Sequence, residues 1–99
     1  MEIRIQSIHF DATSHLNLFI EKKTSKLEKI YEDIQKVEVS LKVVKPETSM
    51  NKYVAIKVLV PRGEFFADKA SNTFEESVDT CLDAIAKQLA KYKEKSRNK

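Results

Sequence analysis

Residues 73–99 of the chain read TFEESVDTCLDAIAKQLAKYKEKSRNK, and the rest of the chain is organised around this stretch. Its apolar residues recur at spacings of three and four, which places them on one stripe of an α-helix. The stripe consists of Phe74, Val78, Cys81, Ile85, Leu89 and Tyr92. We therefore expect a long amphipathic helix that packs one face against the rest of the chain.

Charge is divided along the same predicted helix. The first half carries acidic residues, namely Glu75, Glu76, Asp79 and Asp83, and the second half carries Lys87, Lys91, Lys93, Lys95, Arg97 and Lys99. Acids near the start and bases near the end of a helix complement its dipole and need no ligand. This explanation fits the bases beyond Tyr92 less well, because the dipole effect fades after the last turn. An anionic partner is the alternative.

The composition is that of one small soluble domain. Its 99 residues are 41% hydrophobic and 33% charged, with one glycine and two prolines, so the chain can form a core and is not of low complexity. The single Cys81 excludes an internal disulfide. No apolar run reaches membrane-span length, and the first residues do not resemble a signal peptide. We expect one domain over residues 1–99 and a cytoplasmic location.

The rest of the chain predicts four strands and a second helix. Residues 2–8 alternate between apolar and polar, and a helical period follows from an N-cap at Thr13 or Ser14 to about Tyr31. Alternation returns over 37–43, 53–60 and 64–69, and the last two strands are joined by a tight turn at residues 60–63. In the fourth strand we expect Phe65 to point inward.

The resulting order is βαβββα, which is an α+β fold. The helical crossover predicts a parallel pairing of the first two strands, and the short later links predict an antiparallel meander. One apolar face per strand and one apolar stripe per helix predict two layers. We therefore expect a four-stranded sheet with both helices packed on one face.

Lysines gather on both predicted helices. The first helix carries Lys22, Lys23, Lys26 and Lys29, and the second carries Lys87, Lys91, Lys93 and Lys95. Lys23 falls inside the apolar arc, where its aliphatic stem is expected to lie along the core edge while the ammonium reaches water. If the helices lie side by side, the two sets could form one cationic surface for phosphates. RNA recognised by backbone shape fits better than base readout, because Phe10, Tyr31 and Tyr92 are better core candidates.

The residues give little support for catalysis, and we expect no catalytic residue, metal site or cofactor. The only glycine, Gly63, lies in a turn, so there is no phosphate-binding loop. His9 and His15 have no further ligand at suitable spacing, and Cys81 is expected to be a buried, inert thiol. A small acylphosphatase-like enzyme is an alternative, although it needs the order βαββαβ. A protein-interaction module is another; its outer sheet face would carry Tyr53, Leu59 and Phe66.

Three segments carry a family resemblance that covers nearly all of the chain. They are residues 3–10 followed by Leu16, residues 19–29 with their basic positions, and residues 85–91. In their order and spacing they resemble the short ribosome hibernation promoting factors, a family that includes the ribosome-associated inhibitor of translation. The resemblance implies a fold like a double-stranded RNA-binding domain with an extra first strand.

The resemblance also implies a function. Such proteins bind the small ribosomal subunit in the channel for messenger and transfer RNA, contact 16S rRNA and block translation in stationary phase or stress. By that similarity Lys23, Lys26, Lys29, Lys87 and Lys91 match basic positions, and Lys23 is retained for rRNA. We add Lys22, Lys93 and Lys95 to the expected RNA-binding set.

One departure and several expectations follow. Ala84 stands where relatives often have a base, one turn before Lys87, which shortens the expected basic patch. No small-molecule substrate and no membrane partner are expected, and the protein is expected to be monomeric off the ribosome. The basic end, about residues 93–99, is expected to fray.

Overall fold

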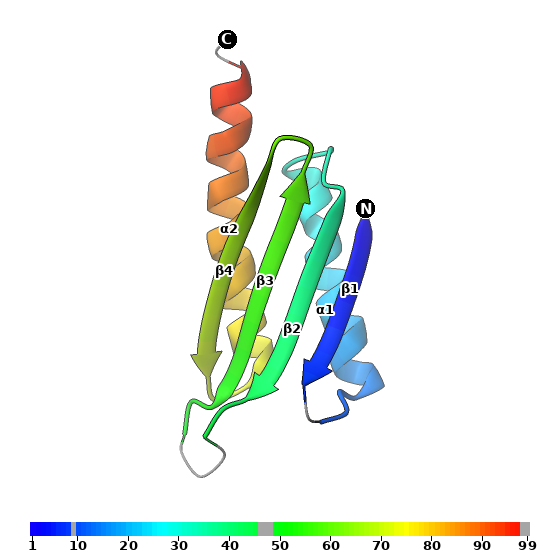
Figure 1. The fold of residues 1–99 in the computed structure, drawn as a ribbon, viewed down its shortest axis with the longest axis vertical. Coiled ribbons are helices and arrows are strands. Elements are labelled where there is room, and N and C mark those ends of the chain that lie inside the picture. Colours follow the sequence, from blue (N-terminus) through cyan, green and yellow to red (C-terminus); the bar gives the residue numbers. More distant parts are fainter. Residues whose placement is uncertain (9, 46–48, 98–99) are drawn as a thin grey trace.

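The computed structural model describes residues 1–8, 10–45 and 49–97, without the side chains of 96 and 97. The elements follow the predicted order βαβββα, with a short 3₁₀ segment, η1, after the first helix (Figure 1). They are β1 (Glu2–Ile8), α1 (Ser14–Ser25), η1 (Lys26–Lys29), β2 (Lys36–Val43), β3 (Lys52–Val60), β4 (Gly63–Ser71) and α2 (Phe74–Arg97).

The four strands form one sheet in the order β1-β2-β3-β4. β1 pairs with β2 in parallel, with Ile5 beside Val39, because the intervening helix returns the chain to the same end of the sheet. β2, β3 and β4 pair in antiparallel fashion, and Val39, Ile56 and Ala67 lie across from one another. The predicted parallel crossover and antiparallel meander are therefore confirmed.

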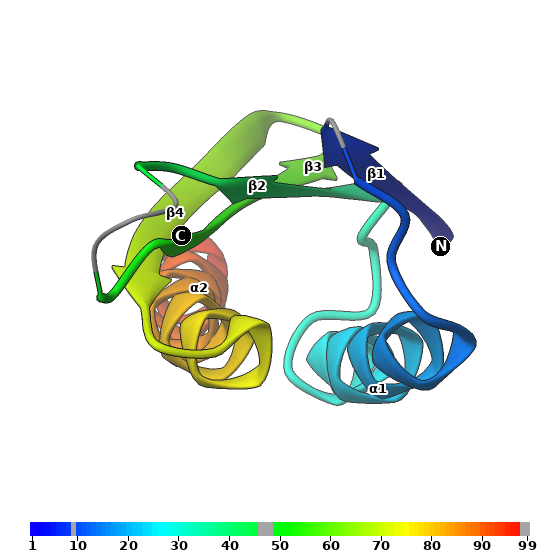
Figure 2. The ribbon, with the colours of Figure 1, turned by 90° about the horizontal axis from the view of Figure 1, so that it is seen from below.

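Both helices cover the same face of the sheet, as Figure 2 shows from below. Alternation in the strands turns every second side chain toward the helices, and these side chains form the core with the helical stripes. The residues with the most completely buried side chains include Ile20, Val37, Val39, Leu41, Val54, Ile56, Val58, Val78, Ile85 and Leu89. The predicted two-layer packing is confirmed.

The first helix is shorter than its apolar pattern predicts. The Thr13 side chain caps it by accepting a hydrogen bond from the Leu16 amide at 3.1 Å. The α-helix ends at Ser25 rather than near Tyr31, and the chain tightens into η1 over the next turn. The Ser25 hydroxyl donates to the Glu21 carbonyl at 2.7 Å, a local bond that competes with regular helix geometry. Lys26 and Lys29 therefore lie on a 3₁₀ turn.

A buried hydroxyl pair fixes the start of α2. The Ser77 hydroxyl donates to the Lys52 carbonyl at 2.6 Å, and its oxygen lies 2.6 Å from the Ser71 hydroxyl oxygen. Ser77 is completely buried, and Thr73 caps the helix by accepting from the Glu76 amide at 3.1 Å. These contacts hold the first turn of α2 against β3 and β4.

α2 extends beyond the end of the sheet (Figure 1). At about 1.5 Å per residue, its 24 residues give a helix far longer than α1. In the described parts of the chain, no helix combines the length and apolar character needed to cross a membrane.

Two predicted connectors fall partly outside the described residues. They are the connector at residues 9–12, through His9, and the connector at 45–51, through residues 46–48.

Candidate RNA interface

Four lysines, here called the α1 lysines, lie on the helical side of the molecule: Lys22 and Lys23 on α1, and Lys26 and Lys29 on η1, which continues it. Three of them are exposed, namely Lys22, Lys26 and Lys29. Within the described chain, none of these three takes part in an ion pair. Their ammonium groups are therefore available to an external anion.

Lys23 differs from the other α1 lysines because it contacts α2. Its Nζ atom lies 3.6 Å from the Asp79 carboxylate oxygen and 5.6 Å from the centre of the Phe19 ring. The Lys23 side chain is only 37% exposed, as expected for a stem that lies along the edge of the core. The sequence did not predict Asp79 as a partner. This ion pair also shows that the two helices lie side by side.

The lysines of α2 point in more than one direction. Lys87 lies on the solvent-exposed side of the helix, where its Nζ is 3.6 Å from the carboxylate of Asp83 one turn earlier. Both side chains are more than 70% exposed, so the pair adds little stability. Lys93 follows Asp79 by two heptads, which places it on the flank of α2 nearer α1.

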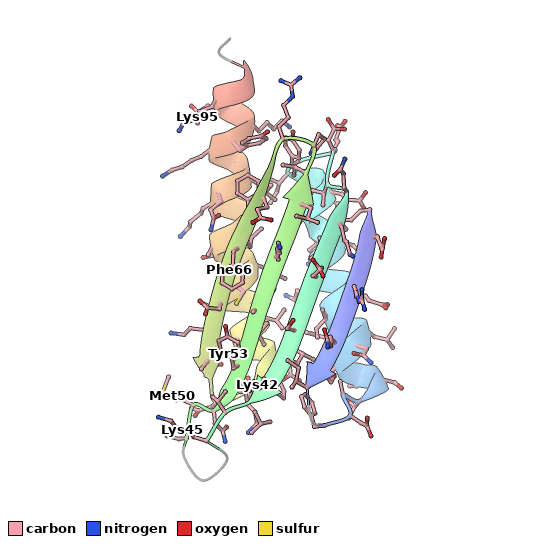
Figure 3. All side chains as sticks on the ribbon, viewed as in Figure 1. Lys42, Lys45, Met50, Tyr53, Phe66 and Lys95 are labelled. Atoms are coloured by element: carbon pink, nitrogen blue, oxygen red, sulfur yellow. The ribbon has the colours of Figure 1, made fainter. Side chains whose placement is uncertain are left out.

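Lys91 and Lys95 lie on the opposite flank, beside β4. Gln88 marks this flank, because its side-chain amide donates to the Phe66 carbonyl of β4 at 3.3 Å. Lys91 and Lys95 follow Gln88 at spacings of three and seven, which keeps them on the same side of the helix. Figure 3 shows Lys95 pointing away from α1.

The structure therefore brings the predicted site residues together only in part. The α1 lysines and Lys87 share the outer surface of the helical layer, with Asp79 and Asp83 between them. Lys91 and Lys95 instead flank a groove at the edge of β4. The predicted lysines therefore lie in two neighbouring basic areas rather than one continuous patch, and the second-helix set is divided between them.

The aromatic residues considered for base stacking belong mainly to the core. Phe10 stacks on Phe74 with ring centres 5.1 Å apart. Tyr92 packs edge to face with Tyr31 at 5.6 Å and with Phe65 at 5.3 Å. All of these rings are partly buried against the core, as predicted, and Phe65 points inward.

The outer face of the sheet does not carry one continuous apolar patch. Phe66 is 54% exposed and lies across from Lys57, whereas Tyr53 lies four residues away along β3. The Tyr53 hydroxyl donates to Asp68 at 2.8 Å; burial and this hydrogen bond raise the pKa of Tyr53. A shallow pocket beside Phe66 is lined by both charge signs, from Glu38 and Lys57.

Cys81 lies in the core and is poorly suited to chemistry. It is 1% exposed, and its sulfur lies 3.5 Å from the Val54 carbonyl oxygen. Burial, with a smaller contribution from Asp68, raises the pKa of the Cys81 thiol from 9.0 to about 12, so the reactive thiolate is suppressed. Among the described residues, no three His, Cys, Asp or Glu side chains come together in a way that could hold a metal.

Comparisons with known proteins extend over nearly the whole chain. Ribosome hibernation promoting factor from Pseudomonas putida is 26% identical over 98 residues, which cover 99% of this chain and 92% of that protein. The protein of the same name from Escherichia coli is 28% identical over 95 residues, or 96% of each chain.

Solved structures share the same architecture. A ribosomal subunit interface protein from Coxiella burnetii matches with a TM-score of 0.80 and 25% identity, over 94% of this chain and 98% of that chain. The N-terminal domain of Thermus thermophilus Protein Y matches with a TM-score of 0.79 at 19% identity, over 93% of this chain and 99% of that chain, and supports the fold alone. Residues 3–97 also match the family model described as "Sigma 54 modulation protein / S30EA ribosomal protein". The chain therefore belongs to this family, as its sequence motifs predicted.

Proposed function

We propose that this protein is a ribosome-binding hibernation factor that acts in the cytoplasm without catalysis. Its proposed target is the decoding region of the small ribosomal subunit, where it contacts 16S rRNA and keeps messenger and transfer RNA out. The family match over residues 3–97 and the relatives named ribosome hibernation promoting factor support this proposal. The residue-level observation that carries it is the group of three exposed lysines, Lys22, Lys26 and Lys29, which form no ion pair within the described chain.

The proposed mechanism is steric occlusion anchored by charge. Lysine ammonium groups neutralise phosphates and release their counterions, which supplies affinity without reading sequence. A rigid two-layer domain holds these groups at fixed spacing, so an RNA surface of matching shape is preferred over a flexible strand. The bound domain then fills space that messenger and transfer RNA need.

The two alternative functions have different support. The acylphosphatase-like enzyme needs the order βαββαβ, whereas this chain has three consecutive strands after its first helix. The interaction module retains one supporting observation, the 54% exposure of Phe66 on the uncovered sheet face. A single exposed ring with mixed charges around it makes this the weaker candidate.

Co-sedimentation with purified ribosomal subunits tests the proposal. We expect the protein to travel with 30S and 70S particles on a sucrose gradient and not with 50S particles alone. Messenger RNA with initiator transfer RNA should displace it, because they need the same space. Binding to 50S particles alone, or a bound fraction that messenger and transfer RNA leave unchanged, would contradict the proposed location.

A further inference from the structure

A groove between α2 and the edge of β4 brings aromatic rings and lysine ammonium groups together. The groove, here called the α2 pocket, is lined by Phe65, Gln88, Lys91, Tyr92 and Lys95. Its volume is about 230 Å³, which lies below the roughly 300–1,000 Å³ of sites for drug-sized ligands. The space therefore suits one planar ring rather than a larger molecule.

The two aromatic rings that line the α2 pocket, Phe65 and Tyr92, are held in place by packing against neighbouring rings. Tyr92 packs edge to face against Phe65 on one side and against Tyr31 on the other, with interplanar angles of 74° and 66°. Phe65 and Tyr92 are only partly buried and line the pocket with their remaining surface. Rings that are already fixed lose little conformational freedom when a second ring stacks on them.

The open side of the α2 pocket is cationic. Lys91 and Lys95 lie one helical turn apart, both are exposed, and neither has an ion pair in the described chain. The residues that line the pocket include no carboxylate. Gln88 adds polar groups, since an amide that donates one bond to the Phe66 carbonyl still has a second N–H and an oxygen acceptor.

This combination selects a ligand with a planar ring beside a negative charge. Each nucleotide of an RNA strand supplies both, whereas a peptide needs an aromatic and an acidic residue in the right order. Bases inside a duplex are already stacked, so the groove would take one from a loop, bulge or single strand. Stacking on an aromatic ring is tolerant of base identity, while the lysines hold the neighbouring phosphates.

We propose that the α2 pocket binds one unpaired base of an RNA strand, with the flanking phosphates held by Lys91 and Lys95. The inference deepens the proposed function, on which it rests, by assigning Lys91 and Lys95 to a stacked nucleotide. The α1 lysines would contact only backbone.

Nuclear magnetic resonance of the isotope-labelled protein tests the base pocket directly. A short oligoadenylate should shift the ring signals of Phe65 and Tyr92 and the side-chain amide signal of Gln88. An abasic ribose–phosphate oligomer of equal length should leave the rings unmoved, because it can reach only the lysines. Unmoved rings with oligoadenylate, or equal ring shifts with both oligomers, would overturn the proposal.

A charge-matched pair of variants separates the pocket from general attraction. Lys91→Gln/Lys95→Gln should weaken oligoadenylate binding by about tenfold, since two phosphate contacts are lost. Arg4→Gln/Lys42→Gln removes the same charge from the outer face of the sheet, away from every proposed RNA contact, and should leave both the ring shifts and most of the affinity intact. Equal weakening by the two pairs would overturn the assignment to this pocket.

Two further measurements identify the source of any failure. A short acidic peptide with one aromatic residue that moves the rings at lower concentration than oligoadenylate would assign the groove to a protein and overturn the proposal. Binding of the parent protein to 30S particles is measured in parallel. Intact 30S binding with unmoved rings contradicts the pocket alone, whereas absent 30S binding with moving rings contradicts the proposed function alone.

Discussion

The Lys23 ammonium group lies beside a carboxylate of the protein and also belongs to the surface proposed to contact rRNA. The Asp79 partner lies 3.6 Å away and is about half exposed, so the ion pair is screened by water and contributes little to folding. The pair has a larger effect on the electrostatic potential of the surface, because the Asp79 carboxylate neutralises the positive charge of Lys23. The pair therefore ties the helices together while it lowers the positive potential of this surface.

We expect Asp79→Asn to strengthen 30S binding by severalfold and to change the free energy of unfolding by less than about 1 kcal/mol. The substitution removes a negative charge beside Lys23 and leaves its stem packed. The matched control is Glu38→Gln, which changes net charge equally on the opposite sheet face. If Glu38→Gln strengthens 30S binding as much, long-range attraction explains the gain, and a direct contact between Lys23 and rRNA is not supported.

Cys81 provides a pH-dependent prediction. We expect Cys81→Ser to lower the free energy of unfolding by about 1–3 kcal/mol near neutral pH, because a hydroxyl replaces a less polar thiol in the core. The folded pKa of about 12 exceeds the ordinary 9.0. The unfolded chain therefore loses the thiol proton first, and the stability due to the neutral thiol is lost as pH rises from 9 toward 12.

The difference in stability between parent and Cys81→Ser should therefore shrink over that alkaline range, since serine does not titrate there. Urea unfolding of both proteins at several pH values measures this difference. A constant difference would show that the thiol is not shielded as its burial indicates.

At the scale of elements, the Ser71–Ser77 pair fixes where α2 begins. We expect Ser77→Ala to destabilise the fold by about 1–3 kcal/mol, because the Lys52 carbonyl and the Ser71 hydroxyl lose a buried partner. Thermal unfolding measures the loss. Thr80→Ala is the control: the Thr80 hydroxyl donates to the Glu76 carbonyl on the exposed side of the same helix, and its loss should matter less. Equal effects would contradict an anchoring role.

The spacing of apolar residues predicted the helices and strands well, because it depends on which side of each element packs against the core. The stripe from Phe74 to Tyr92 and the strand alternation predicted the layers and the inward side of Phe65, while the lengths of the connections predicted the strand pairings. It did not predict the end of α1 at Ser25, because the apolar pattern continues through Leu27 and Ile30 while the backbone changes to a 3₁₀ turn. Nor did it reveal the Ser77 bond to Lys52, 25 residues earlier in the chain.

The candidate site was harder to predict than the fold. Sequence identified the lysines, but their directions depend on how each helix is rotated against the sheet. The neighbours of Lys23 and Lys91, which are Asp79 and Phe65, come from other elements and leave no local signal. One signal was present: Gln88, Lys91, Tyr92 and Lys95 recur at helical spacing on one flank.

In the whole molecule, positive charge lies on both faces, and only the helical side, which includes the α2 pocket, is proposed to contact rRNA. The outer sheet face also carries bases, which are Arg4, Lys36, Lys42 and Lys57. Net charge alone would attract RNA to either face. A test of which face contacts rRNA must therefore remove the same amount of positive charge from each face.

Two quadruple glutamine variants provide this test, and both reduce the net charge by the same amount. One changes the helical face at Lys23, Lys26, Lys87 and Lys91, and the other changes the sheet face at Arg4, Lys36, Lys42 and Lys57. We expect both to fold with melting temperatures near the parent, because these side chains lie at the surface and their ion pairs are exposed.

Binding to 30S particles is then measured against salt concentration for the parent and both variants. Each lost phosphate contact reduces the log–log salt slope by about 0.7–0.9, so the helical-face variant should bind more weakly and with a slope shallower by about three units. The sheet-face variant should lose some affinity at low salt through weaker steering while it keeps the parent slope. A parent-like slope in the helical-face variant would contradict the lysine contacts even if its affinity fell. A slope reduced only in the sheet-face variant would reverse the proposed orientation.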